Sequence, residues 1–316
     1  MLPAVSIIMP TFNRLEFLPP AIESVFAQTF SRWELIIADD GSGAETKAYL
    51  QSLSDPRVKL IWLQHTGRPS VVSNIALREA RGEYVAFLDS DDLWLPRKLE
   101  AQIASLQRHP SRLWSYTRFD LTDEFGKVGT STRDRDRAAP AGWILEKILN
   151  AEVIIAQPSV IVSRQLLEQI GAFDEDLIMC YDDEMWFRLA AHSEIDSVDE
   201  PLTLIRRHGR HSGSDSQAWR DRRRVFEKAL HANRGGPFET TLQKLRAEMS
   251  AGLAKSQARY GSRIDALGTL FSSMPHSWRY PLCWLGAVMV TADRFAPQSL
   301  RILVRRHRHN HRGHSQ

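Results

Sequence analysis

Three acidic side chains follow an apolar segment in GEYVAFLDSDDLWLP, residues 82–96. Asp89, Asp91 and Asp92 stand where a strand of this composition ends. Carboxylate oxygens are hard ligands, and Mg²⁺ or Mn²⁺ held by one or two of them keeps open positions that substrate phosphates can fill. The pattern therefore predicts a divalent cation site that binds a nucleotide diphosphate. The alternative is a helix N-cap, in which Asp91 or Asp92 would begin the amphipathic segment 97–109.

Alternating strands and helices must position these acids. Apolar strand-like segments that end in polar residues or glycine occupy residues 5–14, 33–42, 58–65 and 82–96, with helical segments between them. This alternation predicts an α/β fold with a doubly wound, mostly parallel sheet, in which ligands bind outside the carboxyl ends of the strands. The first helix is expected to bury one face, made of Phe17, Leu18, Ala21, Ile22, Val25 and Phe26.

The order and spacing of several motifs resemble the family 2 glycosyltransferases, which are inverting nucleotide-sugar enzymes with the GT-A fold. The motifs are PTFNR, ADDGS, GEYVAFLDSDD, GAFDE at 171–175 and YDDEMWFRLA at 181–190. The resemblance implies a GT-A-like catalytic domain over residues 1–215. A helical extension with a basic C-terminal tail would follow over residues 216–316.

On the donor side, the resemblance implies contacts to the nucleotide sugar from several strand ends. Asp40 aligns with the acid that contacts the base, and Asp89 and Asp91 align with the acids that contact the ribose and the metal. The implied cofactor is Mn²⁺ or Mg²⁺, held by Asp91 and Asp89. The complete donor-side set is Pro10, Thr11, Asn13, Asp39, Asp40, Arg68, Asn74, Asp89, Ser90, Asp91 and His208.

The resemblance places the catalytic base at the start of a helix that contains Trp186. The family carries a Glu-Asp pair there, whereas this chain has Tyr181 followed by Asp182, which keeps the position of the usual base. A positioned carboxylate makes an acceptor hydroxyl an effective nucleophile by taking its proton. A cation offsets the charge that develops on the diphosphate. One displacement of this kind inverts the anomeric centre. The alternative is a solvated first turn of acids at a helix N-terminus.

Residues 156–175 resemble the acceptor-side segment of the family, which is a strand followed by a helix that ends at Gly171. The implied acceptor-side residues are Gln157, Ser159, Asp183 and Glu184. Trp186 is expected to pack in the core rather than against a sugar, because large aromatic side chains are usually buried anchors. Arg206 and Arg207 could add positive charge beside the phosphates, and the alternative is an exposed basic loop.

Length and composition agree with a soluble enzyme. The chain has 316 residues, of which 43% are apolar and 25% charged, so it can bury a full core. Its 2 cysteines form neither a disulfide framework nor a zinc pattern. The first apolar segment contains Pro10 and lacks the features of a signal peptide, so a cytoplasmic location is expected. The absence of GxGxxG and Walker A motifs argues against dinucleotide oxidoreductases and P-loop kinases.

The C-terminal tail is strongly basic. Residues 294–316 contain arginines and histidines but no acid. Nothing upstream offers a recognition helix for nucleic acid, so anionic lipid headgroups are the better partner. The apolar segment 280–290 falls short of the ~20 residues that span a bilayer, and Trp278 and Trp284 suit a membrane boundary. These features predict peripheral attachment to the inner face of the plasma membrane. A helical subdomain that packs on the catalytic core is the alternative.

The resulting prediction is an inverting, metal-dependent glycosyltransferase. It would move a sugar from a nucleotide-diphosphate donor, a UDP-sugar by default, to a hydroxyl of a glycan or lipid-linked acceptor in polysaccharide or glycoconjugate synthesis. A sugar nucleotidyltransferase is one alternative, but its glycine-rich loop is missing from PTFNRLEF. A non-catalytic sugar-nucleotide-binding scaffold is another, favoured by Tyr181 and disfavoured by Asp182.

Overall fold

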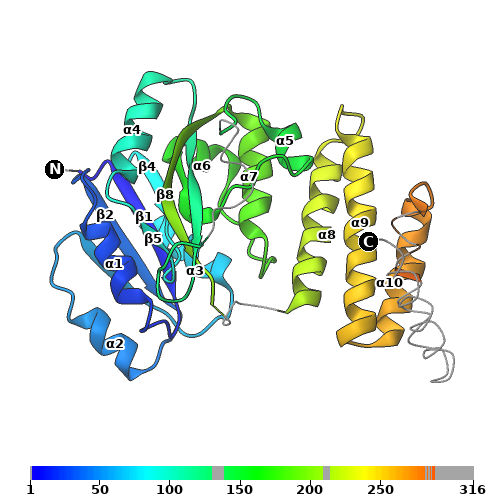
Figure 1. Cartoon of the computed structure of the whole chain (residues 1–316), viewed down its shortest axis with the longest axis horizontal. Coiled ribbons are helices and arrows are strands. Elements are labelled where there is room, and N and C mark those ends of the chain that lie inside the picture. The colour runs from blue at the N-terminus through cyan, green and yellow to red at the C-terminus, as the bar shows by residue number, and fades with distance from the viewer. Residues whose placement is uncertain are drawn as a thin grey trace, which may run out of the picture. The chain divides into compact units, whose positions relative to one another are not determined.

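The computed structural model describes residues 2–129, 139–208 and 214–281, together with 283, 285, 287 and 288. The chain divides into two compact units, residues 1–212 and 213–316. The first is an α/β unit and the second is helical (Figure 1). The predicted α/β class with a helical C-terminal part is therefore confirmed.

A single mixed sheet forms the framework of the first unit. Within the described residues its strand order is β3-β2-β1-β4-β7-β6-β8-β5. The strands are β1 Val5–Thr11, β2 Trp33–Asp39, β3 Val58–Trp62, β4 Tyr84–Phe87, β5 Leu93–Trp94, β6 Trp114–Thr122, β7 Val160–Ser163 and β8 Ile195–Arg206. β1 pairs in parallel with both β2 and β4, whereas β7 runs antiparallel to β4. The carboxyl ends of β1, β2 and β4 consequently meet at one edge, where ligands bind in sheets of this kind.

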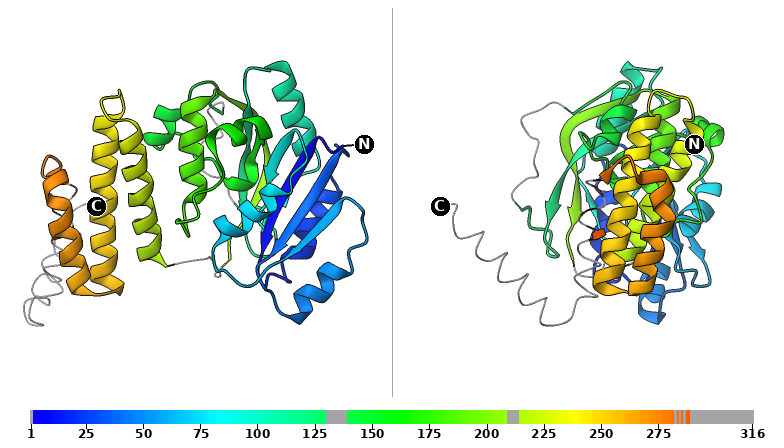
Figure 2. Two further views of the ribbon diagram at one scale, coloured as in Figure 1. Left: turned by 180° about the vertical axis from the view of Figure 1, so that it is seen from behind. Right: turned by 90° about the vertical axis from the view of Figure 1, so that its right-hand side faces the viewer.

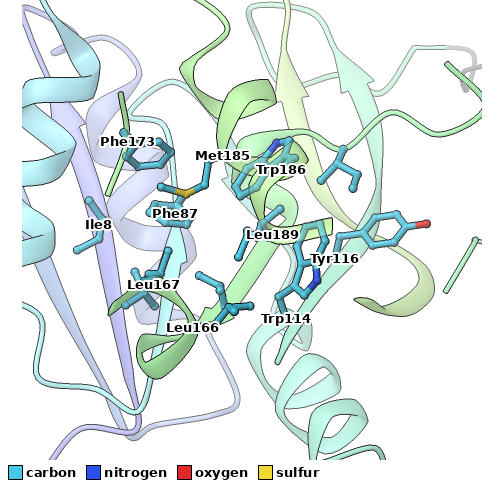
Figure 3. Close-up of a cluster of buried hydrophobic side chains, with 14 of the residues drawn as sticks. Ile8, Phe87, Trp114, Tyr116, Leu166, Leu167, Phe173, Met185, Trp186 and Leu189 are labelled. Carbon is cyan, nitrogen blue, oxygen red and sulfur yellow. The ribbon is translucent and has the colours of Figure 1, made fainter. Parts of the chain in front are cut away.

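Helices cover both faces of this sheet. They are α1 Leu18–Phe26, α2 Ala44–Gln51, α3 Pro69–Arg78, α4 Lys98–Arg108, α5 Leu145–Leu149, α6 Arg164–Ile170 and α7 Tyr181–His192, with a 3-10 turn at Gln157–Ser159. Successive side chains of a strand point to opposite faces, so Ile7 packs under α1 and α4 while Ile8 packs under α3, α6 and α7. In the second of these cores the Trp114 and Trp186 rings stack with centroids 6.2 Å apart (Figure 3).

The structure tests several of the local predictions. Trp186 is 1% exposed, which confirms its place in the core, and α6 ends before Gly171 as expected. The N-cap alternative for the acidic turn is wrong, because α4 begins at Lys98 with Arg97 as its N-cap. Phe26 was expected on the buried face of α1. It is 38% exposed and stacks on Trp33, because it lies at the last turn of the helix, past the edge of the core.

The second unit consists of α8 Asp215–Ala232, α9 Glu239–Tyr260 and α10 Arg263–Ser277. The predicted RGGP turn, residues 234–237, separates α8 from α9. The long helix α9 packs against α8 and against α10 (Figure 2). Among the residues described, no helix is both long and apolar enough to cross a membrane. The basic tail, residues 294–316, and Trp284 lie outside the described residues.

Candidate active site

A pocket of about 540 Å³ lies at the carboxyl ends of β1, β2 and β4. The side chains that line it come from loops far apart in the sequence. They are Pro10, Thr11, Phe12, Arg14, Asp40, His65, Gly67, Pro69, Val72, Asp89, Ser90, Asp91, Asp92, Gln157, Ile178, Met179, Cys180, Tyr181, Asp182, Ile205 and Arg206. The fold therefore gathers the predicted Asp40, the acidic turn after β4 and Asp182 around one cavity.

Asp40 fixes one wall of the pocket. Its carboxylate accepts the backbone N–H of Thr66 at 2.7 Å and that of Gly67 at 2.9 Å, and Nδ1 of His65 lies 3.0 Å from Oδ2. Gly41 makes this approach possible. It has φ +81°, and a Cβ there would lie 2.8 Å from the backbone nitrogen of His65. Only glycine fits a turn of this kind at such close range.

Asp39 and Asn13 hold the ends of β1 and β2 together. The backbone N–H of Ser42 donates to Asp39 Oδ2 at 3.0 Å, and that of Asn13 donates to Ser42 Oγ at 2.9 Å. The side chain of Asn13 in turn accepts the N–H of Gly43 at 2.8 Å. These bonds give both predicted donor-side residues a part in shaping the turn beside the pocket.

The acidic turn after β4 is held from three directions. Oδ2 of Asp91 lies 2.9 Å from Nε2 of His208 and 3.8 Å from Nε of Arg14. Oδ1 of Asp92 accepts the backbone N–H of Arg206 at 2.7 Å. Asp92 therefore anchors the end of β8, while Asp91 faces two cationic or protonatable groups at the pocket.

Carboxyl groups crowd together at this turn, in surroundings that disfavour their charged forms. Burial raises the pKa of Asp89 to about 8, with further contributions from Asp91 and Asp182 and an opposing one from Arg14. Burial and the neighbouring acids also raise the pKa of Asp92 well above its ordinary value. Repulsion of this kind is relieved when a cation binds between the carboxylates.

These residues fit a cation that is shared with a ligand. Within the described part of the chain, no three His, Cys, Asp or Glu side chains form a complete protein site for a metal ion. Mg²⁺ and related ions bound to nucleotides need only one or two carboxylates, because phosphate oxygens and water complete the shell. Asp89 and Asp91 supply hard oxygen ligands of the required kind.

The start of α7 forms another wall of the pocket. Cys180 is the N-cap and has φ +58°, an uncommon backbone conformation for a residue with a Cβ. Tyr181 and Asp182 follow it into the pocket. Burial raises the pKa of the Tyr181 phenol well above its ordinary value, and the charges of Asp89 and Asp182 add to the effect. Tyr181 thus presents a neutral hydroxyl beside the acids.

Glu184, in the first turn of α7, forms a structural ion pair. Its Oε2 lies 2.7 Å from Nη2 of Arg188. Arg188 also donates to the carbonyl oxygens of Ile170 at 2.6 Å and Ala172 at 2.9 Å. The pair therefore ties α7 to the end of α6. Among the described residues, those that line the pocket include neither Asp183 nor Glu184.

Asn74 performs a similar structural task. Its Nδ2 donates to the carbonyl oxygen of Phe173 at 2.9 Å, and its Oδ1 accepts the N–H of the same residue at 2.9 Å. Arg68 reaches the neighbouring carbonyl oxygen of Glu175 at 3.2 Å, and Ser159 Oγ donates to Ala156 O at 2.6 Å. The structure thus places these three predicted site residues outside the described pocket lining.

Three buried polar atoms of the pocket lining are unsatisfied. In the part of the chain that the structure describes, Oγ1 of Thr11, Nε2 of Gln157 and Nε of Arg206 have no hydrogen-bond partner. Buried polar groups are rarely left unsatisfied in folded proteins. A hydroxyl, a side-chain amide and a guanidinium that line a cavity indicate that its ligand is polar and carries hydrogen-bond acceptors.

Sequence reasoning missed several lining residues. The rings of Phe12 and His65 stack with centroids 4.0 Å apart, one after β1 and the other after β3. Arg14 and the segment 178–180 were also not predicted to face the site. The position of Arg14 directly after PTFN was a usable signal. His65 and Met179 carry no periodic signal, because their placement depends on loops that meet only in the folded chain.

A doubly wound, mostly parallel sheet with an acidic turn at the edge where β1 and β4 meet is a GT-A fold, the fold of nucleotide-sugar-dependent transferases. The sequence comparison agrees. The chain belongs to glycosyl transferase family 2, whose family model matches residues 6–170.

Two relatives illustrate the match. The UDP-Glc:alpha-D-GlcNAc-diphosphoundecaprenol beta-1,3-glucosyltransferase WfgD of Escherichia coli is 36% identical over 125 residues, which cover 40% of this chain and 49% of the relative. TuaG of Bacillus subtilis (strain 168), a glycosyltransferase provisionally assigned to teichuronic acid biosynthesis, is 34% identical over 170 residues, covering 53% and 65%. The chain spans about half the length of the first of these relatives.

Solved structures share the fold. TarS 1-349 of S. aureus in complex with UDP-GlcNAc gives a TM-score of 0.62 at 20% identity, covering 93% of this chain and 81% of that one. The mannosyltransferase PcManGT from Pyrobaculum calidifontis, in complex with GDP-Man and Mn²⁺, gives 0.59 at 19% identity, covering 92% and 86%.

Proposed function

We propose that this protein is an inverting glycosyltransferase that moves a sugar from a nucleotide diphosphate to an acceptor hydroxyl. The observation that carries the proposal is the meeting of two acidic groups in one pocket. Asp182 lines the same cavity as Asp89 and Asp91, and its charge helps to raise the pKa of Asp89. A base for the acceptor thus stands close to a turn suited to the diphosphate. The proposed catalytic domain is residues 1–215, with residues 216–316 as its extension.

The donor is proposed to bind with its base near Asp40 and its diphosphate near the acidic turn. The stacked Phe12 and His65 rings offer an aromatic surface at the rim, and Thr11 and Arg206 offer the unsatisfied donors described above. UDP is the proposed nucleotide, in keeping with the UDP-Glc of the E. coli relative and the UDP-GlcNAc bound to TarS.

Asp89 and Asp91 are proposed to hold Mg²⁺ or Mn²⁺. When bound, the ion would offset the negative charge that develops on the departing diphosphate. Arg206 and His208 lie beside the same turn, and their positive or protonatable groups would support this charge from the protein side. The PcManGT complex with GDP-Man and Mn²⁺ shows that a neighbour in fold binds donor and metal together.

Asp182 is proposed to act as the general base. Its carboxylate would take the proton of the acceptor hydroxyl as the oxygen forms a bond to the anomeric carbon. The bond between the anomeric carbon and the diphosphate breaks in the same step, so the configuration inverts. The neutral Tyr181 hydroxyl and Gln157 line the adjoining wall, where we expect the acceptor to lie.

The acceptor is proposed to be a glycan or lipid-linked sugar in polysaccharide or glycoconjugate synthesis. The E. coli relative acts on a diphosphoundecaprenol-linked sugar, and TuaG has a provisional place in teichuronic acid biosynthesis. Such acceptors lie at a membrane, so we propose a peripheral location at its cytoplasmic face. The arginines of residues 294–316 would bind anionic headgroups there.

The test is a donor screen with the purified full chain. Nucleotide sugars are incubated with Mn²⁺ or Mg²⁺, and binding and slow hydrolysis are measured. We expect one donor to be selected, and we expect EDTA or Asp91→Ala to abolish its hydrolysis. Failure to bind any nucleotide sugar would overturn the glycosyltransferase proposal in favour of a scaffold. Hydrolysis that survives EDTA would overturn only its metal dependence.

A further inference from the structure

The inward face of α10 is made of small and polar side chains. Ala266, Thr269, Leu270 and Ser273 are buried. Thr269 Oγ1 donates to Oε1 of Gln257 on α9 at 2.7 Å, and Leu270 packs with alanines of α9. Small residues let two helices approach closely, and they bury little apolar surface for each turn of helix.

The outward face of α10 carries the large apolar side chains instead. We call the following set the α10 stripe, and its members are 48–80% exposed: Ile264, Phe271, Met274, Trp278, Leu285 and Val288. The stripe continues beyond α10, where Cys283 and Ala287 pack inward while Leu285 and Val288 point outward. A surface helix of a soluble protein normally shows the reverse arrangement, with its apolar face on the core.

We propose that the α10 stripe is a membrane-docking surface that lies in the interfacial region of an anionic lipid bilayer. This inference deepens the proposed function, because it rests on a lipid-linked acceptor at the cytoplasmic membrane face. It assigns the docking to a defined apolar face of the second unit, in addition to the basic tail. Helices of this kind lie in the plane of the interface with the apolar side in the acyl boundary.

The charges around the stripe favour a bilayer over a second copy of the chain. Residues 266–278 contain no Asp, Glu, Lys or Arg. Helices that pair in water usually place charged residues beside their apolar seam, where they form interhelical ion pairs. The charges nearest the stripe in the sequence, Arg263, Asp265 and Arg279, flank the two ends of the segment 266–278, and the uncharged stretch between them suits burial among lipids.

The ends of the stripe agree with an interfacial position. The guanidinium of Arg279 lies 5.6 Å from the ring centroid of Trp278, and tryptophan and arginine are favoured at the headgroup level. The chain then continues to residues 294–316, which carry arginines and no acid. Cations that follow an apolar face complement a surface that is anionic outside and apolar within.

The experiment measures binding of the full chain to vesicles of equal parts phosphatidylcholine and phosphatidylglycerol, in low and high salt. The stripe variant is Phe271→Ser with Met274→Ser. The control is Phe125→Ser with Ile154→Ser, which removes two exposed apolar side chains from the first unit. We expect the stripe variant to bind about tenfold or more weakly, because two large apolar side chains no longer enter the acyl boundary. The control should bind as the wild type does.

The salt dependence distinguishes the contribution of the α10 stripe to vesicle binding from that of the basic tail. Burial of apolar groups is not screened by ions, whereas attraction between arginines and headgroups is. The difference between the stripe variant and the wild type should therefore persist in high salt. Equal binding of the two proteins in both salts would overturn the proposal. So would self-association of the wild type that the stripe variant abolishes without any change in vesicle binding.

Two further measurements keep the outcomes distinct. The thermal unfolding of the stripe variant is compared with that of the wild type, and Leu285→Ser serves as a second variant at another turn. Donor hydrolysis is measured without vesicles. Normal donor hydrolysis, together with vesicle binding that is the same in the stripe variant and the wild type, would overturn only the membrane-docking proposal. Stripe-dependent vesicle binding by a chain that binds no nucleotide sugar would overturn the glycosyltransferase proposal and leave the membrane-docking proposal intact.

Discussion

Nε2 of His208 lies 2.9 Å from Oδ2 of Asp91, although 117 residues separate the two in the sequence. The imidazole is almost completely buried and stacks on the ring of Phe17, with centroids 4.7 Å apart. The ring therefore has one fixed orientation, toward the acidic turn. The end of β8 thereby controls where the Asp91 carboxylate points.

His208→Ala should weaken catalysis by removing this control. We expect kcat/KM for the donor to fall about 10–100-fold, the usual cost of losing a group that orients or joins a metal-binding carboxylate, and we expect more Mn²⁺ to be needed for half-maximal rate. The control is His109→Ala, which breaks a His–Asp pair with Asp196 of similar length, 3.1 Å, outside the pocket lining. Equal kinetics for the two variants would refute a role for His208 at the site.

Asp182→Asn should separate chemistry from donor binding. An amide cannot accept the proton of the acceptor hydroxyl, so kcat for transfer should fall about 10²–10⁴-fold. The affinity for the donor, measured by calorimetry, should change little. Asp183→Asn is the matched control, since it alters the next residue of the same helix turn outside the pocket lining. A large loss of kcat in Asp183→Asn, with normal turnover in Asp182→Asn, would assign the role of general base to Asp183 instead.

Local patterns were sufficient to predict the framework of the site. Alternating apolar segments identified β1 to β4. Parallel strands bring their carboxyl ends to one edge of the sheet, independently of the conformation of the loops. Asp40, Asp89, Asp91 and Asp182 accordingly line one pocket. Each lies within four residues of the end of its strand or in the first turn of a helix, so the framework brings its backbone to the pocket.

Side-chain partners across long stretches of sequence could not be predicted. Asn74 was expected at the nucleotide, yet its amide is satisfied by Phe173, 99 residues away. The contact of Asn74 depends on loop packing, and no periodic pattern in the sequence records it. Glu184 was expected near the acceptor, but its carboxylate pairs with Arg188, four residues further along the same helix, and this spacing was a usable signal in the sequence.

Asn74→Ala should destabilise the first unit and leave the chemistry intact. The substitution strands the N–H and C=O of Phe173, and unsatisfied buried groups cost about 1–3 kcal/mol each. Ser73→Ala is the control at the adjacent position. Among the described residues the buried Ser73 hydroxyl has no hydrogen-bond partner, so its removal should be neutral or slightly stabilising. Urea unfolding measures the stability of both variants. An unchanged midpoint for Asn74→Ala would contradict the inference that the Asn74 side chain holds the backbone of Phe173.

Lys98 should make stability depend on pH. It is fully buried in the first unit, where Nζ donates to Gln102 Oε1 at 2.7 Å and lies 4.1 Å from the Trp94 ring centroid. Burial lowers the pKa of Lys98 well below its ordinary value of 10.5. The unfolded chain then binds more protons than the native one between these two pKa values, so stability should rise with pH across that interval. Lys98→Met should flatten this rise and raise the urea midpoint at neutral pH. Lys47→Met, at an exposed position, should change neither, and a wild-type midpoint that falls with rising pH would contradict the prediction.

Two glycines of the second unit should respond to alanine in opposite directions. A Cβ at Gly252 of α9 would lie 2.4 Å from the Trp219 ring of α8, whereas a Cβ at Gly268 of α10 would meet nothing within 4 Å. Gly252→Ala must push apart two packed helices, which we expect to cost about 1–3 kcal/mol. Gly268→Ala removes only backbone freedom and should stabilise the helix by about 0.5–1 kcal/mol. Amide hydrogen exchange in α8 and α9 measures the effect within the unit itself. Slower exchange in both variants would mean that α8 and α9 do not meet at Gly252, because a helix–helix contact that excludes a methyl group cannot be strengthened by adding one.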